Sequence, residues 1–138
     1  MKVYIAILCF FLVGCDNIDY RLKVFNSSMK TVSVFIEKDS LGRIGKNYLK
    51  EPYKIDSDGK EKLKYFEFIS PNDTLVLSQL GYWDRSDNFN SQGNLYLFVI
   101  DSINIHKHLT EADLDSFVRR YRISLKELRN QDWVVKVK

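Results

Sequence analysis

The side chains best suited to contact a ligand are those of Tyr82, Trp83 and Asp84, which lie together in a polar stretch of the chain. Exposed aromatic rings can stack on sugar rings while a carboxylate accepts hydrogen bonds from sugar hydroxyls, and binding residues are often carried by loops. The competing interpretation, which we favour for Trp83, is that its indole plugs the end of a hydrophobic core. The three residues form the candidate ligand-binding site, and no residue is assigned a catalytic role.

Three other short patterns could do chemistry, but each lacks the rest of its motif. His106 and His108 would share one face of an extended chain, yet two imidazoles need at least one further ligand to hold a metal. Residues 56–59 resemble part of a calcium loop, but a lysine and a tyrosine stand where an EF-hand needs its first and last ligands. Residues 42–45 have the GXXG spacing of KH domains without the helices that clamp a nucleotide backbone. We therefore expect surface loops and a turn here, with no metal and no cofactor.

The charged residues also give little sign of a highly charged partner. A basic stretch near the C-terminus could meet lipid phosphates or an anionic glycan. Its members are Arg119, Arg120, Arg122, Lys126 and Arg129. We interpret most of it as the solvated C-terminal end of a helix, where positive charge complements the helix dipole. The formal net charge of the whole chain is only +3, which argues against a dedicated nucleic-acid-binding protein.

The first fifteen residues have the pattern of an export leader. After one lysine, residues 3–13 carry no charge, a length that suits a secretory signal and falls short of the roughly 20 residues that span a bilayer. The run ends in Leu12, Val13, Gly14 and Cys15, which resembles the lipobox of bacterial lipoproteins. In that motif the small residue lets the peptidase cut before the cysteine, and the thiol receives a diacylglycerol. The alternatives are an ordinary signal peptide with a chance cysteine, or a leader that stays uncut.

The lipobox resemblance implies that Cys15 is the lipid-attachment site and ties the chain to a membrane. Several acyl chains on one cysteine would make this anchor stable, since each buried CH₂ contributes about 0.8 kcal/mol. We predict a signal peptide at residues 1–14, a lipidated tether at 15–19 and one globular domain at 20–138. Because Cys9 leaves with the leader, no thiol remains for a disulfide, a nucleophile or a zinc site.

Hydrophobic patterning predicts a chain made mostly of strands. Residues 18–25 and 31–37 alternate apolar and polar side chains, which indicates the two strands of an antiparallel hairpin. Residues 38–59 are predicted to be irregular apart from a short strand at 53–55. Further strands are expected at residues 62–69, 74–78, 95–100 and 133–137. The unbroken apolar run at 95–100 is typical of a central strand that is buried on both faces.

Two helices are expected before the last strand. Thr110 and Ser124 each stand three positions before an acidic residue, which is the signature of a capping box. The first helix is predicted to extend to Tyr121 with one apolar stripe, and the second to include residues 125–128. The order of elements favours a mainly β fold, a single antiparallel β-sandwich-like domain with one or two short helices before the C-terminal strand. An α+β open sheet with the helices on one face is the alternative.

Several segments of the mature chain carry a further resemblance. They are residues 19–28, 32–36, 69–74, 97–101 and 125–128, together with Trp133. Over nearly all of residues 15–138 the chain resembles small uncharacterised lipoproteins of the Bacteroidota type. The resemblance implies one domain and brings no function or catalytic residue with it. Asp16 after the lipidated cysteine keeps some bacterial lipoproteins in the inner membrane, but that rule need not hold for this type, so we expect the outer membrane of the cell envelope.

Three functions are compatible with these features. The leading hypothesis is a membrane-anchored envelope lipoprotein that acts as a non-catalytic binding or accessory module, with a glycan or an envelope protein as its partner. The second is a structural or assembly subunit of an envelope complex, which predicts an exposed edge strand or apolar patch. The third is a small carboxylate-dependent hydrolase, which predicts acids that converge in a cleft with perturbed pKa values.

Overall fold

The structure is a computed structural model that describes residues 17–55, 57–63, 66–105 and 109–138. The predicted leader, Cys15, Asp56, His106 and His108 lie outside the described residues. Within the described ranges, no helix is long and apolar enough to cross a membrane.

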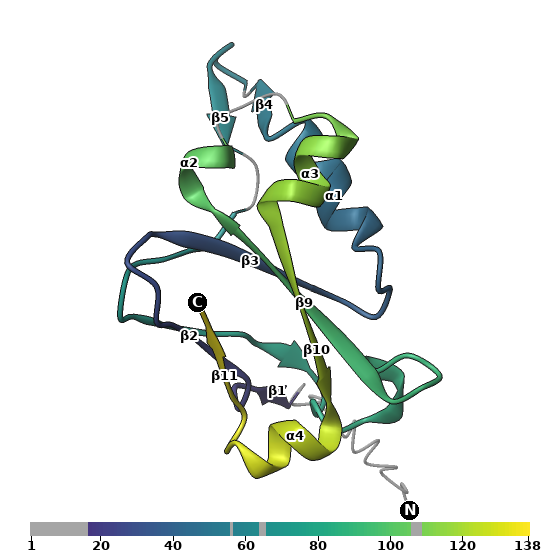
Figure 1. Ribbon diagram of the computed structural model, residues 1–138. Helices are drawn as coiled ribbons and strands as arrows, with labels where there is room; N and C mark the ends of the chain where they lie inside the picture. The colour runs from purple at the N-terminus through teal and green to yellow at the C-terminus, as the bar shows by residue number, and fades with distance from the viewer. Residues whose placement is uncertain (1–16, 56, 64–65, 106–108) are drawn as a thin grey trace, which may run out of the picture.

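Two sheets form the body of the fold (Figure 1). The strand order is β10-β9-β3-β6 in the first sheet and β11-β2-β7 in the second. All neighbouring strands are antiparallel except β11 and β2, which are parallel. The strands of the first sheet are β3 (Val32–Glu37), β6 (Phe68–Ile69), β9 (Asn94–Asp101) and β10 (Val118–Ser124). Those of the second are β2 (Lys23–Asn26), β7 (Thr74–Val76) and β11 (Val134–Val137).

Shorter elements surround the two sheets. Two ribbons pair β1 (Ile18–Asp19) with β8 (Gln79–Leu80) and β4 (Tyr53–Ile55) with β5 (Glu61–Leu63). The helices are α1 (Arg43–Lys50), α2 (Ser102–Ile105), α3 (Glu111–Phe117) and α4 (Leu125–Asn130), with a 3-10 turn η1 (Ser86–Asn88). The strand predicted at 53–55 is β4, and the strand predicted at 62–69 is divided between β5 and β6. The strand predicted at 18–25 is divided between β1 and β2, and β1 consists of Ile18 and Asp19, which the domain prediction also counted in the tether.

The two sheets pack face to face around the main core. Its fully buried members include Val24 and Val137 from the second sheet, and Val32, Leu97 and Val99 from the first. Each such aliphatic side chain contributes about 1.5–3 kcal/mol when it leaves water. The prediction of a mainly β, sandwich-like domain with short helices is therefore confirmed, and the open sheet is not the arrangement found.

β9 is the strand on which both sides of the fold depend. Six consecutive residues of β9 are buried, because its two faces pack against different partners. Leu97 and Val99 face the main core, whereas Ile100 joins a second core under α1, α2 and α3. On this second side Phe98 stacks on Phe35, with ring centroids 5.0 Å apart. The prediction of a central strand buried on both faces is confirmed. Figure 1 shows α1, α2 and α3 at one end of the molecule and β1 with α4 at the other.

The predicted hairpin between the first two long strands is wrong. β2 pairs with β11 and β7, while β3 pairs with β9 and β6, so the chain crosses from one sheet to the other between them. The buried side chain of Asn26 holds this crossover. Its amide nitrogen donates to the carbonyls of Lys30 at 2.7 Å and Ile69 at 2.9 Å, and its oxygen accepts the Ser28 N–H at 3.0 Å. Alternation shows which face of a strand is buried, but it does not identify the partner strand.

A helix, α1, occupies part of the segment that was predicted to be irregular. It begins after Gly42, whose φ of 61° is left-handed. A Cβ at Gly42 would lie 2.7 Å from the ring of Phe98, and one at Gly45 would lie 2.0 Å from the ring of Phe35. The expectation of a flexible loop at the GXXG pattern is therefore wrong. Its two glycines allow α1 to pack closely against the stacked rings of Phe35 and Phe98.

The first predicted helix is only half correct. α3 ends at Phe117, and the chain continues as β10, in which every residue pairs with β9. Residues with β-branched and aromatic side chains recur in this segment, and strand pairing prevails over a spacing that also fits a helix. Both capping boxes are confirmed, between Thr110 and Asp113 and between Ser124 and Glu127.

The close approach of α1 to the first sheet predicts that Gly45→Ala destabilises the fold. The added methyl group would overlap the ring of Phe35, and overpacking of this kind costs about 1–3 kcal/mol. This sign is opposite to that of helix propensity alone, which favours alanine over glycine by roughly 1 kcal/mol. Urea unfolding followed by tryptophan fluorescence measures the difference.

Asn47→Ala is the matched control, because Asn47 is an exposed residue of the same helix. It should be neutral or stabilising by up to about 0.5 kcal/mol. If the two alanine variants were equally stable, the contact between Gly45 and Phe35 would not limit the packing of α1.

Candidate functional site

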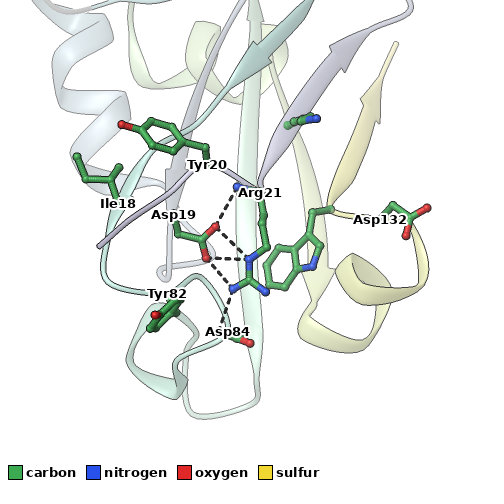
Figure 2. A pocket seen from close by; sticks show the side chains of 9 residues that line it. Ile18, Asp19, Tyr20, Arg21, Tyr82, Asp84 and Asp132 are labelled. Atoms are coloured by element: carbon green, nitrogen blue, oxygen red, sulfur yellow. Dashed lines mark hydrogen bonds and ion pairs between the residues drawn. The ribbon is translucent and has the colours of Figure 1, made fainter. Parts of the chain in front are cut away.

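A groove of about 880 Å³ opens at the end of the molecule where β1 pairs with β8 (Figure 2). Its lining residues are Ile18, Asp19, Tyr20, Arg21, Lys23, Tyr82, Asp84, Asp132 and Trp133. They come from the N-terminal segment, from the loop after β8 and from the link between α4 and β11. Three segments that are distant in sequence thus meet around the guanidinium of Arg21, and we call this site the Arg21 groove.

Asp19 folds the N-terminal segment back on itself. Its Oδ1 accepts the backbone N–H of Arg21 at 2.9 Å, a local turn that aspartate favours. The same carboxylate receives the Arg21 side chain, with Nε and Nη2 at 2.9 and 2.6 Å from Oδ2. The backbone N–H of Trp83 also donates to it at 2.8 Å. One carboxylate, only 4% exposed, therefore ties the start of the chain to the loop after β8.

Asp84 extends this ion pair into a network. Its Oδ1 lies 3.1 Å from Nη2 of Arg21, and its Oδ2 lies 3.7 Å from Nη2 of Arg129. Arg21 thus bridges a buried carboxylate and a half-buried one with a single planar group, a geometry that arginine offers and lysine does not.

Trp133 supplies the floor on which the Arg21 guanidinium rests. The guanidinium carbon lies 4.3 Å from the centroid of the Trp133 ring, a cation–π contact. The backbone at the end of α4 sets the orientation of this ring. Asp132 and Trp133 have φ values of 49° and 62°, and the Trp133 N–H donates to the Leu128 carbonyl at 2.8 Å. This is a Schellman-type ending, and Leu128 and Trp133 then meet in the main core.

The electrostatics of the groove keep its paired acids ionised. Hydrogen bonds from Arg21 lower the pKa of Asp19 from 3.8 to about 2 against the opposing effect of burial, and the Trp83 N–H adds to the lowering. Arg21 lowers the pKa of Asp84 as well. In return, the hydrogen bond to Asp19 raises the pKa of Arg21. The two carboxylates therefore accept hydrogen bonds and do not serve as proton donors near neutral pH.

The rim of the groove is better suited to binding than to proton transfer. Tyr20 and Tyr82 are 56% and 53% exposed, and the exposed residues Lys23 and Asp132 lie at the same groove. Tyrosine combines a flat apolar ring with a polar tip, so this rim can contact a partner that is apolar on one side and hydrated on the other.

The structure separates the three residues of the predicted ligand site. Tyr82 and Asp84 line the groove, and the Tyr82 hydroxyl accepts a hydrogen bond from Nδ2 of Asn17 at 3.0 Å. Trp83 is only 5% exposed and belongs to the main core, where its indole N–H donates to the Leu77 carbonyl at 3.2 Å. The ring of Trp83 is therefore the core plug that we favour from the sequence, and its place in the candidate ligand-binding site is corrected.

The other sequence candidates lie elsewhere. Arg119 and Arg120 are on β10 and not at a helix end. Arg119 pairs with Asp101 at 2.7 Å, and Arg120 donates to the Ser40 carbonyl at 2.8 Å. Arg122 lies on β10 as well, so the expectation of helix-dipole complementarity is wrong for all three arginines. Among the residues that the structure describes, no group of three or more His, Cys, Asp or Glu side chains could hold a metal ion.

Sequence reasoning missed the residues at the centre of the groove. Asp19 was assigned to the tether, Arg21 to the polar face of a strand and Trp133 to the start of the last strand. A local signal exists for the first two, since an aspartate two residues before an arginine suits a side-chain-to-backbone turn. The contacts with Asp84 and Trp133 depend on how distant segments pack, and no local pattern carries them.

Comparisons of the chain with protein-family models, with curated proteins and with solved structures found no match.

The paired state of Asp19 predicts a pH-dependent loss of stability in Asp19→Asn. Because the folded-state pKa of about 2 lies below the ordinary 3.8, the charge stabilises the fold by about 2 kcal/mol at pH 7. This stabilisation is present above about pH 4 and disappears as the pH falls toward 2. Urea unfolding at pH 7, 5 and 3 should show a difference in the free energy of unfolding between wild type and variant that becomes smaller at pH 3.

Asp87→Asn serves as the control in the same loop. Asp87 pairs with Arg85 at 3.0 Å, but both side chains are 61% exposed, so the change should cost less than about 0.5 kcal/mol at each pH. A loss in Asp19→Asn that matched this control, or that stayed constant between pH 7 and 3, would contradict the role given to the buried pair.

Proposed function

We propose that this protein is a lipoprotein of the bacterial cell envelope, held at the outer membrane by lipid on Cys15, and that it acts as a non-catalytic binding or accessory module. The lipobox-like sequence that ends at Cys15 supports the anchor. The observation that carries the binding role is the Arg21 groove, whose first wall residue, Ile18, follows Cys15 by three positions. The groove is the contact surface of the module.

The chemistry of the groove supports binding over hydrolysis. A carboxylate-dependent hydrolase needs one acid whose pKa is raised so that it can protonate a leaving group. In this groove Arg21 lowers the pKa of both Asp19 and Asp84, and it donates hydrogen bonds to both oxygens of Asp19 and to one oxygen of Asp84. Breaking these contacts to free a carboxylate would cost stability at the same time.

The exposed rim of the groove supports a partner from the envelope, either a glycan or a protein. Lys23 and Asp132 offer one charge of each sign beside the guanidinium of Arg21, and Asp132 lies across Arg21 from Ile18 and Tyr20 (Figure 2). A surface with balanced charge does not resemble a site for the phosphate backbone of nucleic acid, which needs an excess of cations.

A second candidate function, an assembly subunit, is favoured by one specific observation. β10 is an edge strand of the first sheet, and a separate groove of about 580 Å³ lies beside it, lined by residues of β10, α4 and β11. An extended segment of another protein could pair with such an edge. Site-specific cross-linking in intact membranes distinguishes the two functions, because an assembly subunit should give a discrete larger product from a probe on β10, whereas a binding module should give one only from a probe at the Arg21 groove.

The lipid anchor predicts that Cys15→Ser abolishes acylation and membrane retention. In the wild type, mass spectrometry of the N-terminal peptide should show a chain that begins at acylated Cys15, and the protein should sediment with membranes. The variant has no thiol to receive the lipid, so the N-terminal peptide should lack any acyl mass.

Cys9→Ser is the matched control, since Cys9 is the other cysteine of the chain and belongs to the predicted leader. It should leave acylation and sedimentation unchanged. A wild-type chain that starts at Met1 and carries a free thiol at Cys15 would contradict the proposal.

A further inference from the structure

We infer that the surface around the β1–β8 ribbon lies in the interface of the same bilayer that holds the anchor, so that the domain rests on the membrane through protein side chains as well as through lipid. This inference rests on the proposed lipidation of Cys15. The surface consists of Ile18, Tyr20, Leu80 and Tyr82, and we call it the ribbon surface.

The ribbon surface is an exposed patch of large apolar and aromatic side chains. Ile18, Tyr20, Leu80 and Tyr82 are 46%, 56%, 68% and 53% exposed. Ile18 and Leu80 are direct partners across the ribbon, and Ile18, Tyr20 and Tyr82 line the same groove. Figure 2 shows Ile18 and Tyr20 on one side of the chain, with Asp19 turned to the other. Single exposed apolar residues are ordinary, but four of them gathered at one ribbon indicate a contact surface.

The N-terminal segment is fixed to the domain immediately before this patch. The Gly81 N–H donates to the Asn17 carbonyl at 2.8 Å, and Nδ2 of Asn17 donates to the Tyr82 hydroxyl at 3.0 Å. Asp19 adds its buried contacts to Arg21 and Trp83. No flexible spacer therefore separates the described start of the fold from the ribbon surface.

Chain length then brings the patch to the membrane. Consecutive Cα atoms are about 3.8 Å apart, so the Cα atom of Cys15 is within about 8 Å of that of Asn17. The polar layer of each leaflet is roughly 5–8 Å thick, because a bilayer of about 40–45 Å contains about 30 Å of hydrocarbon. A lipid on Cys15 inserted in the bilayer leaves no room for a layer of bulk water between Asn17 and the head groups.

The composition of the patch favours a bilayer as its occupant. Tyrosines are enriched at membrane interfaces, where the ring enters the apolar side and the hydroxyl stays hydrated. Four half-exposed side chains offer on the order of 400 Å², about half of the roughly 800 Å² that each partner contributes to a standard protein interface. A bilayer contact does not need this minimum area, because the covalent lipid anchor already supplies most of the affinity for the membrane.

The charges around the patch indicate an apolar contact and not an electrostatic one. The groove beside it contains the cations Arg21 and Lys23 and the anions Asp19, Asp84 and Asp132, which nearly cancel. We therefore expect the contact to be about as strong on a zwitterionic bilayer as on an anionic one, unlike the binding of a polybasic segment.

Two single-cysteine variants of the full lipidated protein test the inference. Leu80→Cys lies on the ribbon surface, and Ile103→Cys lies on α2 at the opposite end of the molecule (Figure 1). Their parent side chains are equally exposed, at 68% and 67%. Each variant is labelled with an environment-sensitive fluorophore and reconstituted into phosphatidylcholine vesicles that carry a nitroxide in the head-group region, with and without phosphatidylglycerol.

We expect quenching at position 80 to be roughly fivefold stronger than at position 103, because an interfacial face enters about 5–10 Å into the head-group boundary. The ratio should be the same with and without phosphatidylglycerol. Ile18→Cys provides a second probe of the same surface and should be quenched like Leu80→Cys.

Equal quenching at positions 80 and 103 would overturn the inference. If mass spectrometry of the same sample shows acylated Cys15, the proposed anchor stands while the membrane contact fails; an unmodified Cys15 removes both.

A label at position 80 that is shielded only at high protein density would indicate a second copy of the chain. A label that N-acetylglucosamine oligomers shield in place of lipid would indicate a glycan. Either result would overturn the bilayer as the occupant.

Discussion

The buried ion pair between Asp19 and Arg21 is the interaction on which this end of the molecule depends. The carboxylate is held by the Arg21 side chain, by the backbone of Arg21 and by the backbone of Trp83, so it joins the first strand to the loop after β8. Arg21 in turn reaches Asp84 and rests on Trp133. Removing one charge from such a cluster leaves the other without its partner, which is more costly than the net value of the pair.

The architecture explains why the β1–β8 ribbon leaves apolar side chains exposed. β9 is covered on one side by the second sheet and, near α1, α2 and α3, by helices on the other, which gives two separate cores. β1 and β8 belong to neither sheet. A ribbon of two residues per strand buries little apolar area, so it depends on the polar contacts of Asp19 and leaves Ile18 and Leu80 in contact with solvent.

Patterns within a few residues predicted much of the fold, but they did not predict most of the contacts that form the Arg21 groove. The apolar run of β9 and the capping boxes at Thr110 and Ser124 were predictable because each signal lies within a few residues. The pairing of β2 was not, because alternation cannot choose between strands, and α1 was missed because Gly45 within it opposes helix propensity. Of the predicted ligand residues, Tyr82 and Asp84 line the groove, while the size and apolarity of the Trp83 ring place it in the core.

The most direct test of this arrangement is amide hydrogen exchange in the full-length protein, followed at Arg21 and Trp83. Both N–H groups donate to the buried carboxylate of Asp19, at 2.9 and 2.8 Å. If the ion pair fixes the fold close to the anchor, both amides should exchange many times more slowly than those of an unstructured chain. Exchange at the unprotected rate would show that Asp19 does not fix the start of the fold, and it would contradict the rigid end on which the proposed membrane contact depends.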